Sequence, residues 1–344
     1  MELASVTERT VLVDPGGNRV EQVIEHRTDP LLGTVASVNA ALGEKARAFL
    51  GSADLELLRD LEVKSRAGCP FCGAAERGTR FLPEVVPEGQ LRVGDALAMP
   101  NLFSKCAFDS VVVVDPARHV LSPSQISPQA LGDAFRVASE LVRLARAHDP
   151  SLAHHIAGMN FLQPAGSSVP HPHLQVHVRS VPYSGVALAT RRSAEFLART
   201  GRSFFAALLD KERALGARWI GRTGDVEWVA AFAPAHPKEI WGILPGTASL
   251  ADVSEADARA FAEGISRIVS FYEEGGIHPF NLVFISSPEP AAATGFALHV
   301  KVCSRPALKS LYVNYDTWFG PLFAGDDVHT EAPEAYAQRL RARW

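Results

Sequence analysis

The segment 171–177 holds the residue types best suited to chemistry in this chain, in the order His-Pro-His-Leu-Gln-Val-His. Alternate residues of an extended strand point to the same side, so the spacing predicts a row made of His171, His173, Gln175 and His177. Side chains in such a row stand about 7 Å apart. Their imidazoles can bind a metal or attack phosphorus, and the amide can bind phosphate oxygens. The segment therefore indicates metal binding together with phosphate chemistry.

Small and polar residues stand before this row, at Asn160 and at Gly166, Ser167 and Ser168. A phosphate can come close to the backbone where side chains are small. The ordinary alternative is a strand whose polar side only faces water. We favour the functional interpretation because four polar side chains share one side of a strand that is otherwise apolar.

Cys69 and Cys72 form a second motif, Cys-Pro-Phe-Cys, bounded by Gly68 and Gly73. Two cysteines on a tight turn can present both thiolates to one tetrahedral Zn²⁺, which leaves two ligands to find. Histidines are expected there, and His119 and His171 are the best candidates. A pair of buried thiols is the structural alternative. A redox pair is the third, but no thioredoxin-like strand–motif–helix order surrounds the motif.

Composition narrows the class of protein. The chain has 344 residues, a formal net charge of −4, 47% hydrophobic and 21% charged residues, which is typical of a soluble globular protein. This balance gives no reason to expect a nucleic-acid or membrane partner. The first residues do not form a secretory signal, and no run approaches the length of a membrane span. We therefore expect a cytoplasmic protein without a disulfide framework.

Periodicity predicts an α+β fold. Strands are expected over 91–100, 108–114, 156–161, 171–181, 227–232, 240–244, 281–286 and 296–303, and helices over 53–64, 127–147, 189–215 and 254–274. The order strand–strand–helix–strand–strand thus occurs twice. The simplest architecture is a duplicated unit whose halves share one largely antiparallel sheet with helices packed on it. The expected halves are 1–185 and 186–344.

The residues from Asn160 through Gly166-Ser167-Ser168 to His171-Pro172-His173-Leu174-Gln175 resemble the signature of the galactose-1-phosphate uridylyltransferase family. This family is the transferase branch of the histidine-triad superfamily. In order and rough spacing the resemblance covers most of the chain. Its further matches are Asp29-Pro30-Leu31, Cys69-Pro70-Phe71-Cys72, Asn101-Leu102-Phe103, Pro116-Ala117-Arg118-His119, Pro237-Lys238-Glu239 and Tyr312 to Asp316. It implies that both halves are histidine-triad-like.

The resemblance also implies roles for single residues. His173 would be the nucleophile, forming a covalent nucleotidyl-imidazole. Gln175 would bond a non-bridging oxygen on the α-phosphorus. A structural zinc would be held by Cys69, Cys72, His119 and His171.

Substrate contacts are implied in the same way. They fall at Asn101, Phe103, Asn160, Gly166, Ser167, Ser168, Tyr315 and Asp316. Asn101 and Phe103 would border the nucleoside, whose base the sequence does not identify. Members of the family are typically dimers, so Tyr315 and Asp316 are expected to act across a homodimer interface. His177 is an additional imidazole that either binds phosphate or only packs.

The chemistry is sound without the resemblance. Neutral imidazole is a good nucleophile near pH 7, and a covalent intermediate divides one exchange into two displacements. Gln175 can donate a hydrogen bond but has no proton to give to a poor leaving group. A sugar phosphate leaves as a stabilised anion and needs none. We therefore expect transfer between phosphorylated acceptors in preference to hydrolysis.

Three functions stay open on the sequence. The first is a zinc-containing nucleotidyltransferase of carbohydrate metabolism that exchanges a nucleoside monophosphate between a nucleotide-sugar and a sugar 1-phosphate. The second is a phosphorylase of nucleotide-sugars or dinucleoside polyphosphates that uses inorganic phosphate as acceptor. The third is a nucleotide-binding protein without turnover.

Overall fold

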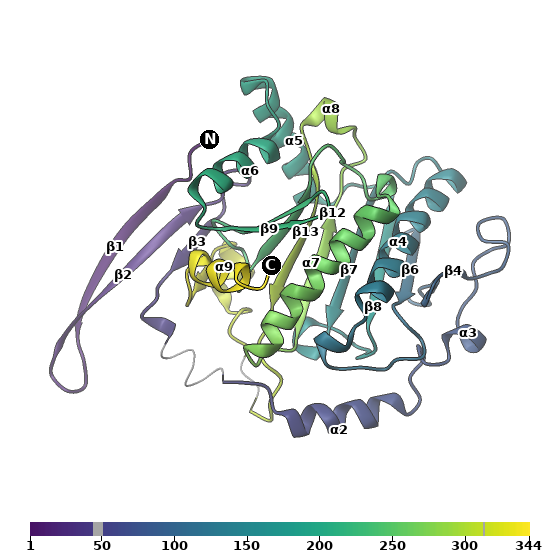
Figure 1. Cartoon of the computed structure of the whole chain (residues 1–344), viewed down its shortest axis with the longest axis horizontal. Helices are drawn as coiled ribbons and strands as arrows, with labels where there is room; N and C mark the ends of the chain where they lie inside the picture. Colours follow the sequence, from purple (N-terminus) through teal and green to yellow (C-terminus); the bar gives the residue numbers. More distant parts are fainter. Residues whose placement is uncertain (44–50, 312–313) are drawn as a thin grey trace.

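A ten-stranded sheet forms the body of the protein (Figure 1), in a computed structural model that describes residues 1–43, 51–311 and 314–344. Every neighbouring pair in this sheet is antiparallel. In spatial order the strands are β4 (Leu91–Val93), β5 (Ala96–Pro100), β6 (Phe108–Val113), β8 (His173–Arg179), β7 (His154–Phe161), β12 (Phe280–Ile285), β13 (Leu298–Ser304), β11 (Ile240–Leu244), β10 (Val226–Ala230) and β9 (Trp219–Thr223). The predicted α+β class with one antiparallel sheet is confirmed.

One face of this sheet is fully covered by helices. In Figure 1, α4 (Pro128–His148) and α7 (Glu255–Glu274) lie side by side across it, and α9 (Pro333–Arg341) packs at the end near β9. Ser127 caps α4 by accepting a bond from the amide of Ala130, and Pro128 occupies the first turn. Ser254 and Asp257 form a capping box at the start of α7. The largest apolar cluster of the protein lies between these helices and the sheet.

Within the residues that the structure describes, the opposite face is covered only at its two ends. At one end, α5 (Ser184–Thr200) and α6 (Phe204–Leu215) pack on β10 and β11. At the other, the Cys69–Cys72 turn packs on β5 and β6. The strands between the two ends, β8, β7, β12 and β13, leave side chains of this face partly exposed. Chemistry is therefore expected on this uncovered middle of the sheet.

Three predicted elements differ clearly in extent from the structure. The single strand over 91–100 is a hairpin of two strands that turns at Gly94, whose φ is +54°. The single helix over 189–215 is two helices, because Gly201 ends α5 in the left-handed region and Ser203 caps α6. The strand predicted over 171–181 is also shorter, because β8 covers His173–Arg179 and His171 precedes it.

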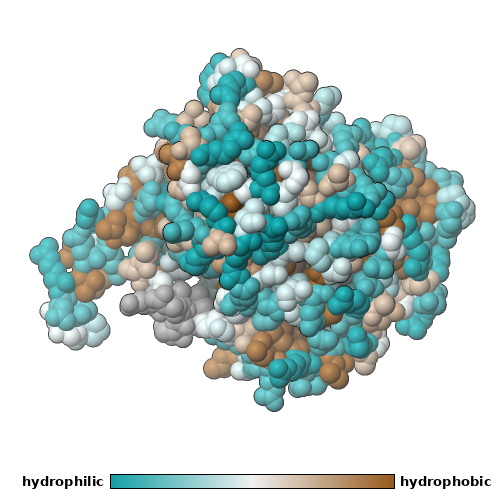
Figure 2. Space-filling model, in the orientation of Figure 1, coloured by the Kyte–Doolittle hydropathy of each residue, from teal (hydrophilic) through white to brown (hydrophobic). Residues whose placement is uncertain are grey.

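A second, four-stranded sheet was not predicted. It consists of β1 (Ser5–Val13), β2 (Arg19–Thr28), β3 (Val35–Val38) and β14 (Asp327–His329), with β14 parallel to β3. The hairpin of β1 and β2 extends from the body as an arm (Figure 1). Figure 2 shows apolar residues on this arm, and five of its valines and leucines are exposed: Val6, Val11, Leu12, Val13 and Val23.

The remaining helices are short or peripheral. They are α2 (Leu55–Arg66), α3 (Ala74–Arg77) and α8 (Ala291–Thr294), with single turns at Pro123–Gln125, Gln163–Ala165, Leu250–Asp252 and Gly320–Ala324. Within the described ranges, no helix has the length and apolar character needed to cross a membrane. The boundary between the halves 1–185 and 186–344 stays a prediction, although each side of it supplies five strands to the sheet.

His155 forms a buried polar site on β7. Its Nδ1 lies 3.1 Å from the carbonyl oxygen of Ala153, and its Nε2 lies 3.1 Å and 2.7 Å from the hydroxyls of Ser249 and Ser286. Burial lowers the pKa of His155 to about 4. The imidazole is therefore neutral in the folded protein at pH 7 and resists protonation.

We expect His155 to make the fold acid-sensitive between pH 6.5 and about 4. In that window the unfolded chain binds a proton that the folded chain does not, so stability falls as the pH falls. From pH 7 to pH 5 the loss at this residue is about 2 kcal/mol. Urea unfolding of His155→Gln should show a pH dependence smaller by that amount, with no difference in dependence between pH 7 and pH 8. Equal pH dependence in both proteins would contradict this assignment.

Candidate active site and metal centre

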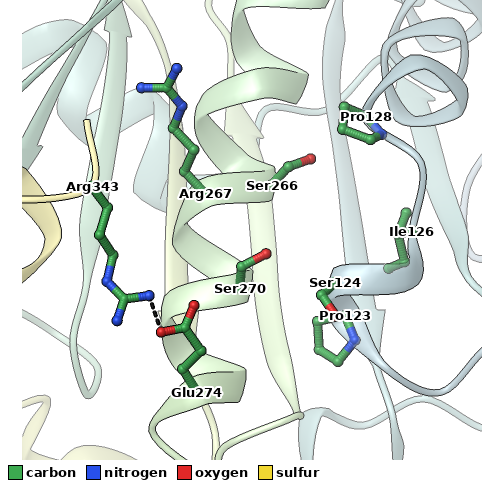
Figure 3. A pocket seen from close by; sticks show the side chains of 9 residues that line it. All are labelled: Pro123, Ser124, Ile126, Pro128, Ser266, Arg267, Ser270, Glu274 and Arg343. Carbon is green, nitrogen blue, oxygen red and sulfur yellow. Dashed lines mark ion pairs between the residues drawn. The ribbon is translucent and has the colours of Figure 1, made fainter.

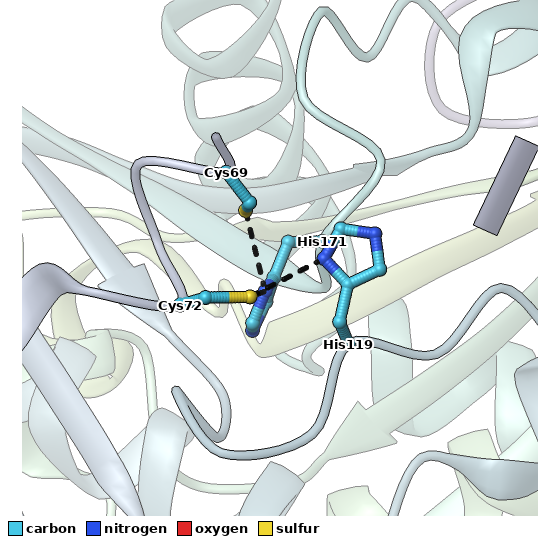
Figure 4. A group of neighbouring side chains, drawn as sticks. All are labelled: Cys69, Cys72, His119 and His171. Atoms are coloured by element: carbon cyan, nitrogen blue, oxygen red, sulfur yellow. Dashed lines mark hydrogen bonds between the residues drawn. The ribbon is translucent and has the colours of Figure 1, made fainter. Parts of the chain in front are cut away.

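Cys69, Cys72, His119 and His171 meet in one cluster, called the metal cluster below (Figure 4). One ligand atom from each residue lies within 4.8 Å of the others. The Nδ1 atom of His171 is 3.7 Å from Sγ of Cys69 and 3.5 Å from Sγ of Cys72. The Nδ1 atom of His119 is 3.5 Å from Sγ of Cys72. Two thiols and two imidazoles at this spacing suit a tetrahedral zinc ion.

The far nitrogens of both histidines are fixed by other groups. Nε2 of His171 lies 2.9 Å from the carbonyl oxygen of Asp115, to which it donates. Nε2 of His119 lies 2.8 Å from the hydroxyl of Ser65 on α2. A proton held at Nε2 leaves the Nδ1 lone pair directed at the cluster, which is the usual outer-shell arrangement of a metal-binding histidine.

Both histidines of the metal cluster are in the neutral form that can bind a metal. Burial lowers the pKa of His171 to about 4 and also lowers that of His119, so both rings are neutral at pH 7. The pKa of Cys72 is raised to about 11, mainly by burial and to a smaller extent by the neighbouring Cys69. A bound divalent cation would supply the positive charge that thiolates need in this setting.

His173 begins β8 with its ring almost enclosed, at 8% exposure. Its Nδ1 lies 2.8 Å from the carbonyl oxygen of His171 and donates to it. Nε2 therefore carries the lone pair, and no described residue forms a hydrogen bond with it. Burial lowers the pKa of His173, and Lys105 acts in the same direction. The residue is a neutral imidazole with one nucleophilic nitrogen.

Phe71 connects the metal cluster to this imidazole. Its ring centre is 6.1 Å from that of His171, edge-on, and 4.7 Å from that of His173. Phe71 stands between the two cysteines in sequence. The turn that holds the thiols therefore also packs against the nucleophile.

Gln175 and His177 follow His173 on the same side of β8, as the alternation predicted. His171 lies outside the strand, and its side chain belongs to the metal cluster instead. Gly158 of β7 is opposite Gln175. A Cβ at Gly158 would lie 2.8 Å from the carbonyl oxygen of Leu282, so the position excludes a side chain and leaves room beside Gln175.

Asn160 lies near the end of β7 at which His173 begins β8, because these strands are antiparallel. Its side chain is exposed on the uncovered face. Asn281 of β12 is directly opposite, and its Nδ2 lies 2.7 Å from Oδ1 of Asn160 and 2.9 Å from the carbonyl oxygen of Ala165. Asn281 was not among the predicted site residues.

The loop 162–168 carries the other predicted phosphate contacts. It starts at Leu162, a buried non-glycine residue with φ of +67°, which is a strained conformation. The amides of Gly166 and Ser167 already donate to the carbonyls of Gln163 and Leu162, and the hydroxyl of Ser167 donates to Val169. Of the three predicted contacts Gly166, Ser167 and Ser168, the exposed Ser168 is therefore the one whose hydroxyl is not engaged by these bonds.

Asn101 starts a loop of exposed residues, among them Phe103 at 81% exposure. The buried carboxylate of Asp109 on β6 fixes this loop by accepting from Nδ2 of Asn101 and from the amide of Lys105, at 3.2 Å and 2.7 Å. The same carboxylate is 3.6 Å from Nε2 of His177. Asp109 was missed as well, although a lone charge near the start of an otherwise apolar strand is a signal that the sequence offers.

Tyr315 and Asp316 share no hydrogen bond or ion pair with the His173 region. Tyr315 lines a separate hollow of about 670 Å³, together with Lys238 and His329. Asp316 is buried and pairs with Arg305, whose Nε lies 2.9 Å from one of its carboxylate oxygens. Their predicted contact with substrate remains a prediction, and Tyr312 lies outside the described residues.

Another hollow, of about 400 Å³, lies on the helix-covered side between the start of α4 and α7 (Figure 3). Serines, prolines and the ion pair between Arg343 and Glu274 line it. The sheet separates it from His173, so it is not part of the candidate active site.

Comparisons with solved structures identify the fold. A GalT-like protein from Arabidopsis thaliana superposes with a TM-score of 0.68 and 18% identity, over 92% of this chain and 98% of that one. This chain has the GalT-like fold. An ADP-glucose phosphorylase from the same plant, solved with ADP-glucose bound, has a TM-score of 0.69, 18% identity and the same coverage. A uridylyltransferase has a TM-score of 0.63 and 19% identity, over 73% of this chain and 85% of that one.

Sequence comparisons add one relative without a described activity. An uncharacterized protein of Archaeoglobus fulgidus is 29% identical over 335 residues, which are 96% of this chain and 95% of that protein. No family model matches the chain.

We expect the metal cluster of this GalT-like chain to hold about one zinc ion per chain. Cys72→Ser should lose most of the metal and unfold at lower temperature, because a structural site contributes its binding energy to folding. Elemental analysis with thermal unfolding measures both effects. Cys106→Ser, outside the cluster, is the matched control. Full zinc content in Cys72→Ser would rule out this ligand set.

Proposed function

We propose that the chain belongs to the galactose-1-phosphate uridylyltransferase family and transfers a nucleoside monophosphate through His173. The observation that carries the proposal is the state of this one imidazole. It is neutral, its Nδ1–H is bonded to the carbonyl of His171, and its Nε2 is left without a partner among the described residues. The shared GalT-like fold supports the same assignment.

In the first displacement, Nε2 of His173 attacks the α-phosphorus of a nucleotide-sugar. The bond from that phosphorus to the bridging oxygen breaks, and the sugar 1-phosphate leaves with the electron pair. The imidazole becomes a cation when it bonds to phosphorus. Its Nδ1–H bond to the carbonyl of His171 strengthens as the charge forms. The acceptor phosphate then reverses these steps.

Neutral donors on the uncovered face would bind the phosphoryl oxygens. Gln175 stands two residues after the nucleophile, and the amide of Asn160 and the hydroxyl of Ser168 border the same region. Donors fixed before the reaction stabilise developing charge most strongly, because they need no reorganisation. Gln175 cannot supply a proton, so the leaving group must be a stable anion.

Zinc would have a structural role, held by Cys69, Cys72, His119 and His171. The ion would fix the turn that carries Phe71 and the loop that carries the His171 carbonyl. Both groups contact His173. The chain's own residues would therefore perform the chemistry, in a nucleotide-sugar enzyme that we further propose to be cytoplasmic and homodimeric.

A second acceptor is favoured by a specific observation. Asp316, implied as a hexose contact, is buried and neutralised by Arg305. Because Asp316 is already paired with Arg305, it is not available to bind a hexose. An acceptor without a hexose, such as inorganic phosphate, needs no such contact. Phosphorolysis of a nucleotide-sugar through the same His173 intermediate is therefore the second candidate function.

We expect His173→Ala to lose turnover on the order of 10⁴-fold or more while keeping its zinc. The wild type incubated with nucleotide-sugars labelled in the α-phosphate should retain label on His173. A panel including ADP-glucose and UDP-glucose also identifies the base. His148→Ala, an exposed histidine at the end of α4, is the matched control. Normal turnover in His173→Ala would contradict the proposed mechanism.

The acceptor can be identified by letting inorganic phosphate and hexose 1-phosphates compete for the label on His173. Labelled enzyme should release a nucleoside diphosphate to inorganic phosphate, or a nucleotide-sugar to a hexose 1-phosphate. For the second candidate function, in which Asp316 is paired with Arg305, we expect phosphate to discharge the label faster than hexose 1-phosphates by roughly tenfold or more, the effect of one lost binding contact. Faster discharge by a hexose 1-phosphate would instead establish the transferase.

A further inference from the structure

Asn281 links the second half of the sheet to the phosphate-binding side of the first. It belongs to β12, lies opposite Asn160 of β7 and also reaches the loop 162–168 at Ala165. The two bonds from its Nδ2 are 2.7 Å and 2.9 Å long. Asn281 has no role in the two displacements proposed for His173.

The polarity of this contact follows from the backbone. A carbonyl oxygen only accepts hydrogen bonds, so the atom of Asn281 facing Ala165 must be its amide nitrogen. The second hydrogen of that nitrogen points to Asn160 and requires an acceptor there. The side chain of Asn160 must therefore present its oxygen to Asn281. Its own NH₂ group is then turned to the opposite side.

We propose that Asn281 is a positioning residue that orients the Asn160 amide so that its NH₂ group faces the transferred phosphate. The inference rests on the proposed function, which places a phosphate on this face. Asn160 is exposed there, and its Nδ2 has no hydrogen-bond partner within the described ranges of the chain. Asn281 acts through Asn160 and the loop, without touching substrate itself.

A second observation favours a functional role. Oδ1 of Asn281 is buried, and no described residue donates to it. An unsatisfied buried acceptor costs stability, so a purely structural position would be better filled by another residue. Both donor hydrogens of Asn281 are used, and they fix the direction of the neighbouring amide.

The decisive variant is Asn281→Asp, which keeps the shape and removes the donors. A carboxylate facing the Ala165 carbonyl and the Asn160 oxygen would repel both. Asn160 would then turn its NH₂ group to Asp and its oxygen to the phosphate. We expect labelling of His173 by a nucleotide-sugar to slow by roughly 100-fold, the effect of one misplaced donor in a preorganised site.

The order of two variants separates orientation from packing. Asn281→Ala removes the contact without inverting it and leaves Asn160 free to rotate, so we expect a smaller loss, roughly tenfold. A packing role predicts the reverse order, because Asp fills the space and Ala does not. Labelling that is slower in Asn281→Ala than in Asn281→Asp, with both proteins folded by thermal unfolding, would overturn the proposal.

A double-mutant cycle tests whether Asn281 acts through Asn160. In an Asn160→Ala background, Asn281→Asp should slow labelling by no more than about threefold, because the amide it orients is gone. An undiminished 100-fold effect in that background would overturn the proposal. Asn18→Asp, in the exposed turn of the arm, is the matched control and should label at the wild-type rate.

Equilibrium binding keeps this test separate from the proposed function. If the wild type binds AMP or UMP by calorimetry but never labels His173, nucleotidyl transfer fails while the orientation is still measured by affinity. Asn281→Asp should then bind the monophosphate more weakly than Asn281→Ala. Equal affinities of wild type and Asn281→Asp, or a wild type that binds neither nucleotide, would overturn the inference.

Discussion

The carbonyl oxygen of His171 is the point at which the metal cluster and the proposed nucleophile meet. The side chain of His171 lies against Cys69 and Cys72, while its carbonyl accepts the Nδ1–H of His173. The ring of His171 is thus held in the metal cluster, while its backbone carbonyl is held by the hydrogen bond from His173. Phe71, carried by the same cysteine turn, packs on both imidazoles. A metal ion bound by the thiols would therefore also help to hold the tautomer of His173, and its proposed role would be structural.

The sheet places this junction beside its uncovered middle. One face is closed by α4 and α7, and the other is closed at its ends by α5 and α6 and by the cysteine turn. The open strands between them, β8, β7, β12 and β13, come from both sides of the predicted boundary at residue 185. A site on these strands needs both halves. Asn281, from the second half, supplies the contact that orients Asn160 in the first.

The sequence predicted what depends on short spacing and missed what depends on long-range pairing. The spacing His-x-His-x-Gln is enough to place His173 and Gln175 on one side of a strand. The motif Cys-x-x-Cys, together with His171 as a candidate third ligand, indicates the metal cluster. The arm was missed because the residues of β1 are exposed on both sides and show no alternation. Asn281 was missed because its partner Asn160 is 121 residues away, a pairing that only the register of β12 on β7 creates. Glycines broke two predicted elements, since φ of +54° at Gly94 and +70° at Gly201 cannot continue a strand or a helix.

The proposed phosphate region would rely on neutral donors more than on cations. Lys301 lies on β13 and pairs with Glu239 and Trp241, whereas Arg305 comes directly after β13 and pairs with Asp316. The groups that we propose for phosphate binding are the amides of Asn160 and Gln175 and the hydroxyl of Ser168, with Lys105 as a nearby charge. A fixed cation would bind donor and acceptor phosphates tightly before and after reaction, which lowers the ground state without helping the displacement. Oriented dipoles gain most when charge moves onto the equatorial oxygens, provided that their direction is set in advance. In this fold the direction of the Asn160 amide is set by two hydrogen bonds. The Ala165 carbonyl fixes the amide of Asn281, and Asn281 in turn fixes the amide of Asn160.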